Sequence, residues 1–65
     1  MRLEVNGDQH EVTGPTLADA LTELGWGEAR VATALNGIFV ARAARGETDL
    51  KDGDRLEVLA PMQGG

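Results

Sequence analysis

The 65-residue chain is predicted to fold as a small α+β domain, with one main helix packed across a small mixed sheet. Three observations predict this class. Short alternating segments flank two Asn-Gly pairs, which is the pattern of two β-hairpins. One segment between these hairpins has apolar residues at helical spacing. A last alternating segment precedes a proline, so the predicted order is hairpin, helix, hairpin and strand.

The first hairpin is predicted from "MRLEV" and "DQHEV", which lie on either side of Asn6-Gly7. Met1, Leu3 and Val5 alternate with charged residues, as expected for a strand with one buried face. Asn and Gly are the residues that best tolerate the positive φ angles of a type I′ turn. The alternation and the turn pair therefore predict the same element.

A short helix is predicted to follow Gly14-Pro15, which breaks the strand pattern. Thr16 is the expected N-cap, and Asp19, three residues later, completes an approximate capping box. Gly25 is expected to form the C-cap. A helix of this length depends on packing against a sheet. The face expected to pack there consists of Leu17, Ala20, Leu21 and Leu24.

The second half is predicted to contain a hairpin from "RVATAL" and "IFVAR" around Asn36-Gly37. Residues 41–49 are expected to form a polar connection, with Leu50 as its single buried anchor. The last strand is "RLEVLA", with Leu56 and Val58 facing the core. Pro61 ends this strand because proline cannot donate to the ladder. We therefore expect a folded domain over residues 1–60 and a flexible tail over residues 61–65.

Composition excludes several classes of function. The chain has no Cys and one His, so neither a thiolate nor a nucleophile–base pair is available. The formal net charge of −5 disfavours nucleic-acid binding, which depends on Lys and Arg. No segment has the length of a membrane span or the pattern of a signal peptide. We expect a cytoplasmic protein that binds neither nucleic acid nor membrane, holds no cofactor and is not an enzyme.

The remaining polar and aromatic candidates are each better explained by a structural role than by a functional one. His10 is expected to be a structural or surface residue of its strand. Asp49, Asp52 and Asp54 suggest a metal cluster, but "DLKDGD" lacks the downstream Glu of an EF-hand loop and is better explained as turn chemistry. Trp26 is expected to pack beneath the end of the helix, with a role as partner anchor as the alternative.

The combination of "VATALNGIFVAR", "LKDGDRLEVL" and a terminal Gly-Gly resembles the ThiS family of sulfur carriers in bacterial thiamine biosynthesis. The similarity covers essentially the whole chain and implies the β-grasp, or ubiquitin-like, fold. Family members commonly have Pro-Arg at the position of Ala41-Arg42 and often an aromatic residue near Arg45. These differences affect contacts in the connecting segment, where Arg42 and Arg45 either contact partners or offset the local acidic charge.

The resemblance implies a chemistry for the tail. The carboxylate of Gly65 is adenylated with ATP by a ubiquitin-activating-type, ThiF-like enzyme, and a sulfur donor protein supplies the sulfur of a thiocarboxylate. A ThiG-like thiazole synthase then uses this sulfur. Gly64 gives the activating enzyme access to the carboxylate of Gly65, because a residue without a side chain fits a narrow channel and bends freely. Metal ligands and catalytic residues are not expected in the chain.

Leu59 is expected on the face opposite Leu56 and Val58, next to the tail. Together with Met62 it forms a possible apolar docking patch, with incidental exposure as the alternative. Alternative functions also stay open. The first alternative is a related carrier for molybdopterin or another sulfur product. The others are a ubiquitin-like modifier of proteins and a binding module without tail chemistry.

Overall fold

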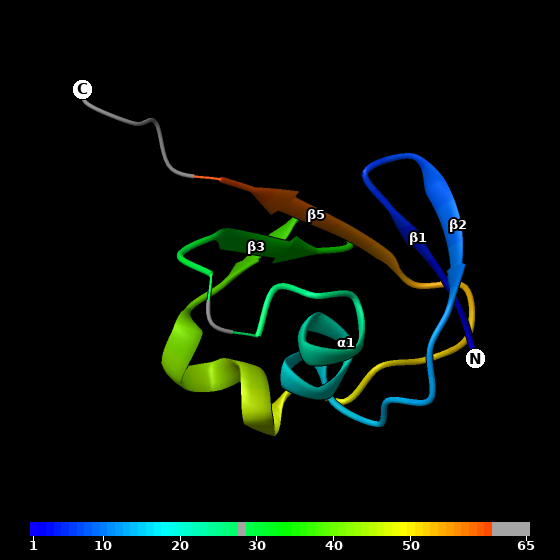
Figure 1. The fold of residues 1–65 in the computed structure, drawn as a ribbon, viewed down its shortest axis with the longest axis horizontal. Coiled ribbons are helices and arrows are strands. Elements are labelled where there is room, and N and C mark those ends of the chain that lie inside the picture. The colour runs from blue at the N-terminus through cyan, green and yellow to red at the C-terminus, as the bar shows by residue number, and fades with distance from the viewer. Residues whose placement is uncertain (28, 61–65) are drawn as a thin grey trace.

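The structure is a computed structural model that describes residues 1–27 and 29–60 (Figure 1). The tail predicted over residues 61–65 lies outside the described residues. Within the described part, the elements follow one another as β1 (Arg2–Val5), β2 (Asp8–Glu11), α1 (Leu17–Glu23), β3 (Ala32–Leu35), β4 (Ile38–Val40), the 3-10 helix η1 (Arg42–Glu47) and β5 (Arg55–Leu59).

The described strands form one mixed sheet in the order β2-β1-β5-β3-β4. The two hairpins, β1 with β2 and β3 with β4, are antiparallel, as predicted. β5 lies between them, parallel to β1 and antiparallel to β3. The last strand of the chain therefore occupies the centre of the sheet and joins the two hairpins.

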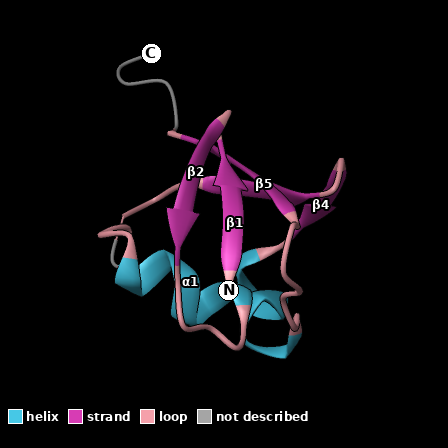
Figure 2. Ribbon diagram, turned by 90° about the vertical axis from the view of Figure 1, so that its right-hand side faces the viewer, coloured by secondary structure: helices cyan, strands magenta, loops and turns pink. Residues whose placement is uncertain are grey.

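The helices lie together on one face of the sheet, and the described segments leave the other face uncovered (Figure 2). Strand alternation places Leu3, Val5, Leu56 and Val58 on the covered face, and all four are buried. The complete buried apolar core consists of Leu3, Val5, Val12, Leu17, Ala20, Leu21, Leu50, Leu56 and Val58. The predicted two-layer α+β arrangement is confirmed.

The ends of α1 follow the predicted capping chemistry. The Thr16 hydroxyl accepts a hydrogen bond from the Asp19 N–H, and the Asp19 carboxylate accepts one from the Thr16 N–H, both at 3.2 Å. This reciprocal pair is a capping box. At the other end Leu24 is the C-cap, and Gly25 follows it with a φ of +96°. The predicted glycine therefore lies one residue beyond the C-cap, where positive φ is common.

The connection over residues 41–49 differs from its prediction in two ways. It contains η1, and Leu50 is not its single buried anchor, because Arg45 is equally buried, each being 7% exposed. The Arg45 Nε donates to the Thr33 hydroxyl at 3.0 Å, and Nη2 donates to the Val31 carbonyl oxygen. Burial of a charged side chain requires such partners, which pattern analysis along the chain does not reveal.

Glu23 joins the last turn of α1 to the segment that follows β2. Its carboxylate accepts hydrogen bonds from the Thr13 N–H at 2.9 Å, the Thr13 hydroxyl at 2.8 Å and the Gly14 N–H at 3.0 Å. These bonds favour the ionised form. The Thr13 N–H, followed by the Thr13 hydroxyl, holds the pKa of Glu23 below its usual value of 4.5.

Glu23→Gln is expected to lower the urea midpoint of unfolding at neutral pH, because the amide is a weaker acceptor for the Thr13 donors. A lowered folded-state pKa contributes stability above the unfolded-state pKa, and that contribution is lost as pH falls through the folded-state value. The difference between wild type and variant should therefore shrink below pH 4.5. Urea titrations across pH 3 to 7 measure it. Glu47→Gln, on exposed η1, is the control, and an equal pH-dependent loss there would contradict the assignment.

Candidate functional site

The reacting group predicted from the sequence is the carboxylate of Gly65. Gly65, Gly64 and Met62 all lie outside the described residues, and Ala60 is the last residue described. The structure therefore shows the support from which the tail begins. This support is β5 and its surroundings.

β5 pairs with β1 at Arg55 and Leu56, and with β3 from Leu56 to Leu59. On one side the Glu4 and Asn6 N–H groups donate to the carbonyl oxygens of Asp54 and Leu56, both at 3.0 Å. On the other side the antiparallel register with β3 runs from Leu35 opposite Leu56 to Ala32 opposite Leu59. The end of β5 from which the tail begins is therefore fixed by its pairing with β3.

The two turn asparagines also hold β5, a role that turn chemistry alone does not predict. The Asn6 side chain donates to the Val58 carbonyl oxygen at 3.0 Å and accepts from the Val58 N–H at 2.9 Å. The Asn36 side chain accepts from the Arg55 N–H at 3.0 Å and donates to Asp54 Oδ1 at 3.0 Å. Each side-chain amide thus acts as an additional rung of the sheet. Positive φ values of +50° and +52° place both asparagines at the turns from which they reach β5.

The uncovered face of the sheet carries a small apolar depression, here called the apolar hollow. Leu59 and Phe39 are 67% and 69% exposed, as expected for residues on this face. Ala32 lies opposite Leu59, and Ala34 lies opposite both Phe39 and Glu57. Small side chains beside large ones leave a depression of about 110 Å³. The prediction that Leu59 lies exposed beside Glu57 is confirmed.

Phe39 was not singled out by the sequence analysis. The signal is present in "IFV", because Val40 lies opposite Thr33 on the covered face, which places Phe39 on the uncovered one. Ile38 is 71% exposed, but its register opposite Leu35 puts it on the other face, at the end of the hairpin. Of the two large apolar residues of the apolar hollow, Leu59 was anticipated from the sequence and Phe39 was missed.

Of the two arginines considered for partner contact, only Arg42 is exposed. Arg45 is buried and donates to Thr33 and Val31, a structural role that the sequence analysis did not predict. Both arginines line a groove of about 550 Å³ beside Leu59 and Ala60. Trp26 is partly buried against the core, as predicted.

Of the three aspartates considered as a metal cluster, Asp52 and Asp54 accept hydrogen bonds from backbone N–H groups. The Asp54 carboxylate accepts from the Lys51 N–H at 2.8 Å, and Asp52 accepts from the Arg2 N–H. The bond to Asp54 closes the turn before β5, in agreement with the prediction of turn chemistry, and the bond to Asp52 joins this turn to β1. His10 is half-buried on β2, opposite Leu3. Over residues 1–27 and 29–60, no group of three or more possible metal ligands is found.

None of the described helices is long and apolar enough to cross a membrane. The longest, α1, has 7 residues.

Comparisons with known proteins agree on one family. The ThiS family model matches residues 3–65. The sulfur carrier protein ThiS of Thermus thermophilus is 38% identical over 61 residues, which cover 94% of this chain and 95% of that protein. The crystal structure of the thiamine biosynthesis protein ThiS from Geobacter metallireducens aligns with a TM-score of 0.83 at 38% identity and covers all of both chains.

A solution structure of a thiamine biosynthesis protein from the same organism aligns with a TM-score of 0.76 at 36% identity, covering 100% of this chain and 88% of that one. The sheet, its crossing helix and the family match confirm the predicted β-grasp fold. On this evidence, the chain belongs to the ThiS family.

Proposed function

We propose that this protein is a sulfur carrier of thiamine biosynthesis and that the carboxylate of Gly65 is its reacting group. The observation that carries the proposal is the match to the ThiS family, which extends to Gly65. The names of the relatives from Thermus and Geobacter support the same role. The held position of β5 supports it further, because a fixed support presents the tail to a partner in one direction.

The chemistry follows from the properties of a terminal carboxylate. Its ordinary pKa lies near 3.5, so at neutral pH it is ionised and a poor electrophile. In the proposed scheme a carboxylate oxygen attacks the α-phosphorus of ATP on a ThiF-like enzyme and pyrophosphate leaves. Sulfur at the sulfide level, delivered by a donor protein, then attacks the acyl carbon, the bond to AMP breaks, and the product is a thiocarboxylate. A ThiG-like thiazole synthase receives that sulfur, so the carrier acts as a co-substrate and the partners perform the catalysis.

The proposal is tested by intact-mass measurement. The protein is incubated with ATP, the ThiF-like enzyme of its source organism and a sulfur donor. Replacement of one terminal oxygen by sulfur is expected to add about 16 Da to the ionised carboxylate end. Transfer of this sulfur to thiazole, followed with the ThiG-like synthase, distinguishes a thiamine carrier from a carrier for another product. No mass gain with an active enzyme would contradict the proposal.

We expect the apolar hollow to dock on the activating enzyme. Leu59→Asp should raise the KM for the carrier in adenylation by at least about tenfold, because a desolvated apolar anchor becomes a charge. Ile38→Asp is the matched control, since Ile38 is equally exposed but points to the other face. Initial rates of pyrophosphate release measure both variants. Equal KM values for wild type and a folded Leu59→Asp variant would show that the exposure of Leu59 is incidental.

A further inference from the structure

A second partner-facing feature adjoins the apolar hollow at the end of β5. It is the groove of about 550 Å³, here called the basic groove, whose lining includes Arg30, Val31, Arg42, Arg45, Leu59 and Ala60. None of its described lining residues is acidic, although the chain as a whole has 11 acidic and 6 basic residues. Half of the basic residues of the protein therefore line one groove.

The guanidinium of Arg45 is fixed in the groove by neutral partners. Its Nε donates to the Thr33 hydroxyl at 3.0 Å and its Nη2 to the Val31 carbonyl oxygen. Among the described residues, no ion pair involves Arg45, Arg30 or Arg42. Nε and Nη2 of Arg45 thus donate to neutral protein atoms, and none of the described acidic groups forms an ion pair with this side chain. Such a fixed charge favours an anionic partner more strongly than a mobile surface charge does.

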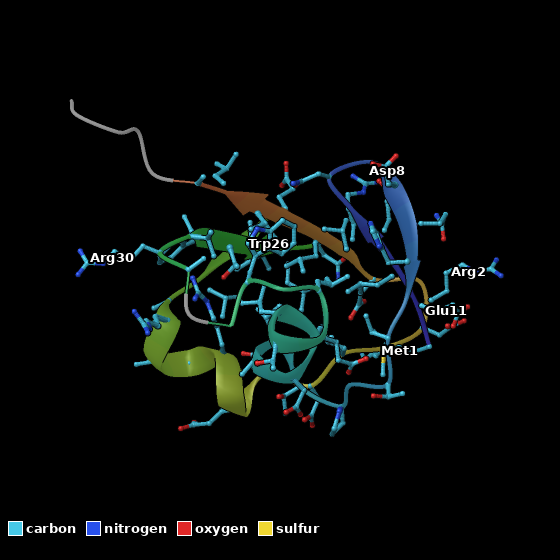
Figure 3. All side chains as sticks on the ribbon, in the orientation of Figure 1. Met1, Arg2, Asp8, Glu11, Trp26 and Arg30 are labelled. Atoms are coloured by element: carbon cyan, nitrogen blue, oxygen red, sulfur yellow. The ribbon has the colours of Figure 1, made fainter. Side chains whose placement is uncertain are left out.

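The arginines elsewhere in the molecule are arranged differently. Arg2 lies 3.7 Å from a Glu11 oxygen, and Arg55 lies 3.6 Å from a Glu4 oxygen. Figure 3 shows Arg2 and Glu11 together at one end of the molecule, whereas Arg30 extends outward at the other end, on the side where β5 ends. The groove residue Arg30 therefore lies at the opposite end of the molecule from the ion pair of Arg2 with Glu11.

We propose that the basic groove receives an acidic segment of the enzyme that activates the C-terminus, and this inference rests on the proposed function. Charge complementarity identifies the occupant, because the exposed Arg30 and Arg42 lie beside the buried Arg45 in a protein of net charge −5 and single out this groove for a carboxylate-bearing partner. Continuity with the apolar hollow supports it, because Leu59 lines both features. The occupant carries apolar residues as well, which pack on Val31 and Leu59.

The position of the groove explains what such a contact contributes. Ala60 lines it, so a partner held there is held at the first residue beyond β5. The planar guanidinium groups bind carboxylates in defined directions, and the contact therefore orients the partner as well as attracting it. Long-range attraction by the net charge of the carrier favours a basic partner surface, so the groove reverses the sign of the interaction locally. A partner with one acidic segment in a basic surface then has a single favourable orientation.

The first test uses the carrier alone and a short peptide of alternating glutamate and leucine. The backbone amide signals of Val31 and Ala60 are expected to shift on addition of this peptide. A peptide with glutamine in place of glutamate should leave them unchanged, as should the glutamate peptide added to an Arg30→Gln/Arg42→Gln variant. Both substituted residues are exposed, so the fold is retained. Equal shifts with the two peptides, or none with either, would overturn the proposal.

The second test uses the activating enzyme. Arg30→Gln/Arg42→Gln is expected to raise the KM for the carrier about tenfold and to leave kcat unchanged, because the lost contacts are charge pairs of docking. Lys51→Gln, which removes a cation from the turn before β5, is the control and should behave as wild type. A fall in kcat at constant KM would overturn the proposal by placing the arginines at the reacting group. Failure of the wild type to gain sulfur would instead count against the proposed function.

Discussion

Removal of Gly65 is expected to abolish the gain of about 16 Da that accompanies thiocarboxylate formation at the ionised terminus. The shortened chain still ends in a glycine carboxylate, so the chemistry of the terminus is unchanged. The expected loss comes from the shorter distance that the tail can span from the docked domain to the reaction site. One residue of extended chain spans about 3.3–3.6 Å, whereas a near-attack geometry requires reacting atoms within about 3–3.5 Å of each other. A terminus one residue short therefore remains outside the reaction distance when the domain is docked.

The same intact-mass assay measures the effect. The deletion lies five residues beyond Ala60, and the last sheet pair joins Ala32 to Leu59, so thermal unfolding should be unchanged. Gln63→Ala keeps the terminal Gly64-Gly65 pair and is the control expected to gain sulfur normally. A normal mass gain by the deletion variant would show that the enzyme tolerates a shorter reach, and the assignment of Gly65 would be wrong.

Arg45→Ala is expected to lower the free energy of unfolding by about 3 kcal/mol. The variant loses two hydrogen bonds from a charged donor, each of which contributes about 1.5–3 kcal/mol, as well as the packing of a buried aliphatic stem. Domains of this size rarely have more than about 3–5 kcal/mol of total stability. We therefore expect a large unfolded fraction at room temperature.

Urea unfolding measures this loss, and two variants separate its causes. Arg45→Met keeps most of the stem volume and removes the donors, so its midpoint should lie between those of wild type and Arg45→Ala. Arg42→Ala removes an exposed cation from the same 3-10 helix and should stay within about 0.5 kcal/mol of wild type. Wild-type stability in Arg45→Ala would contradict the structural role assigned to the guanidinium.

The elements that sequence analysis predicted correctly are those set by local physics. Asn6-Gly7 and Asn36-Gly37 specify their turns through positive φ, and Thr16 with Asp19 specifies the start of α1. The pairing of β1 with β5 was not predictable in the same way. It depends on segments about 50 residues apart, and alternation reveals a buried face without naming the neighbouring strand. The order of the strands in the sheet was therefore left open by the sequence and is given by the structure.

The residues of the candidate site also fall into two groups, those placed by local alternation and those placed by contacts between distant segments. Leu59 was placed by alternation within its own strand, and alternation within "IFV" would have placed Phe39 as well. The burial of Arg45 was missed because it depends on Thr33 and Val31, which precede Arg45 by more than ten residues. The basic groove is also non-local, since Arg30, Arg42 and Ala60 come from three separate segments.

The central position of β5 has a consequence for the synthesis of the protein. The first four strands form two hairpins, and isolated two-stranded hairpins are marginally stable in water. The complete sheet can form only after residues up to Leu59 have left the ribosome, because β5 joins the two hairpins. Truncated products of translation that stop before β5 therefore cannot fold and are exposed to proteolysis. The topology thus ensures that the molecules that fold are those whose synthesis has reached the start of the tail.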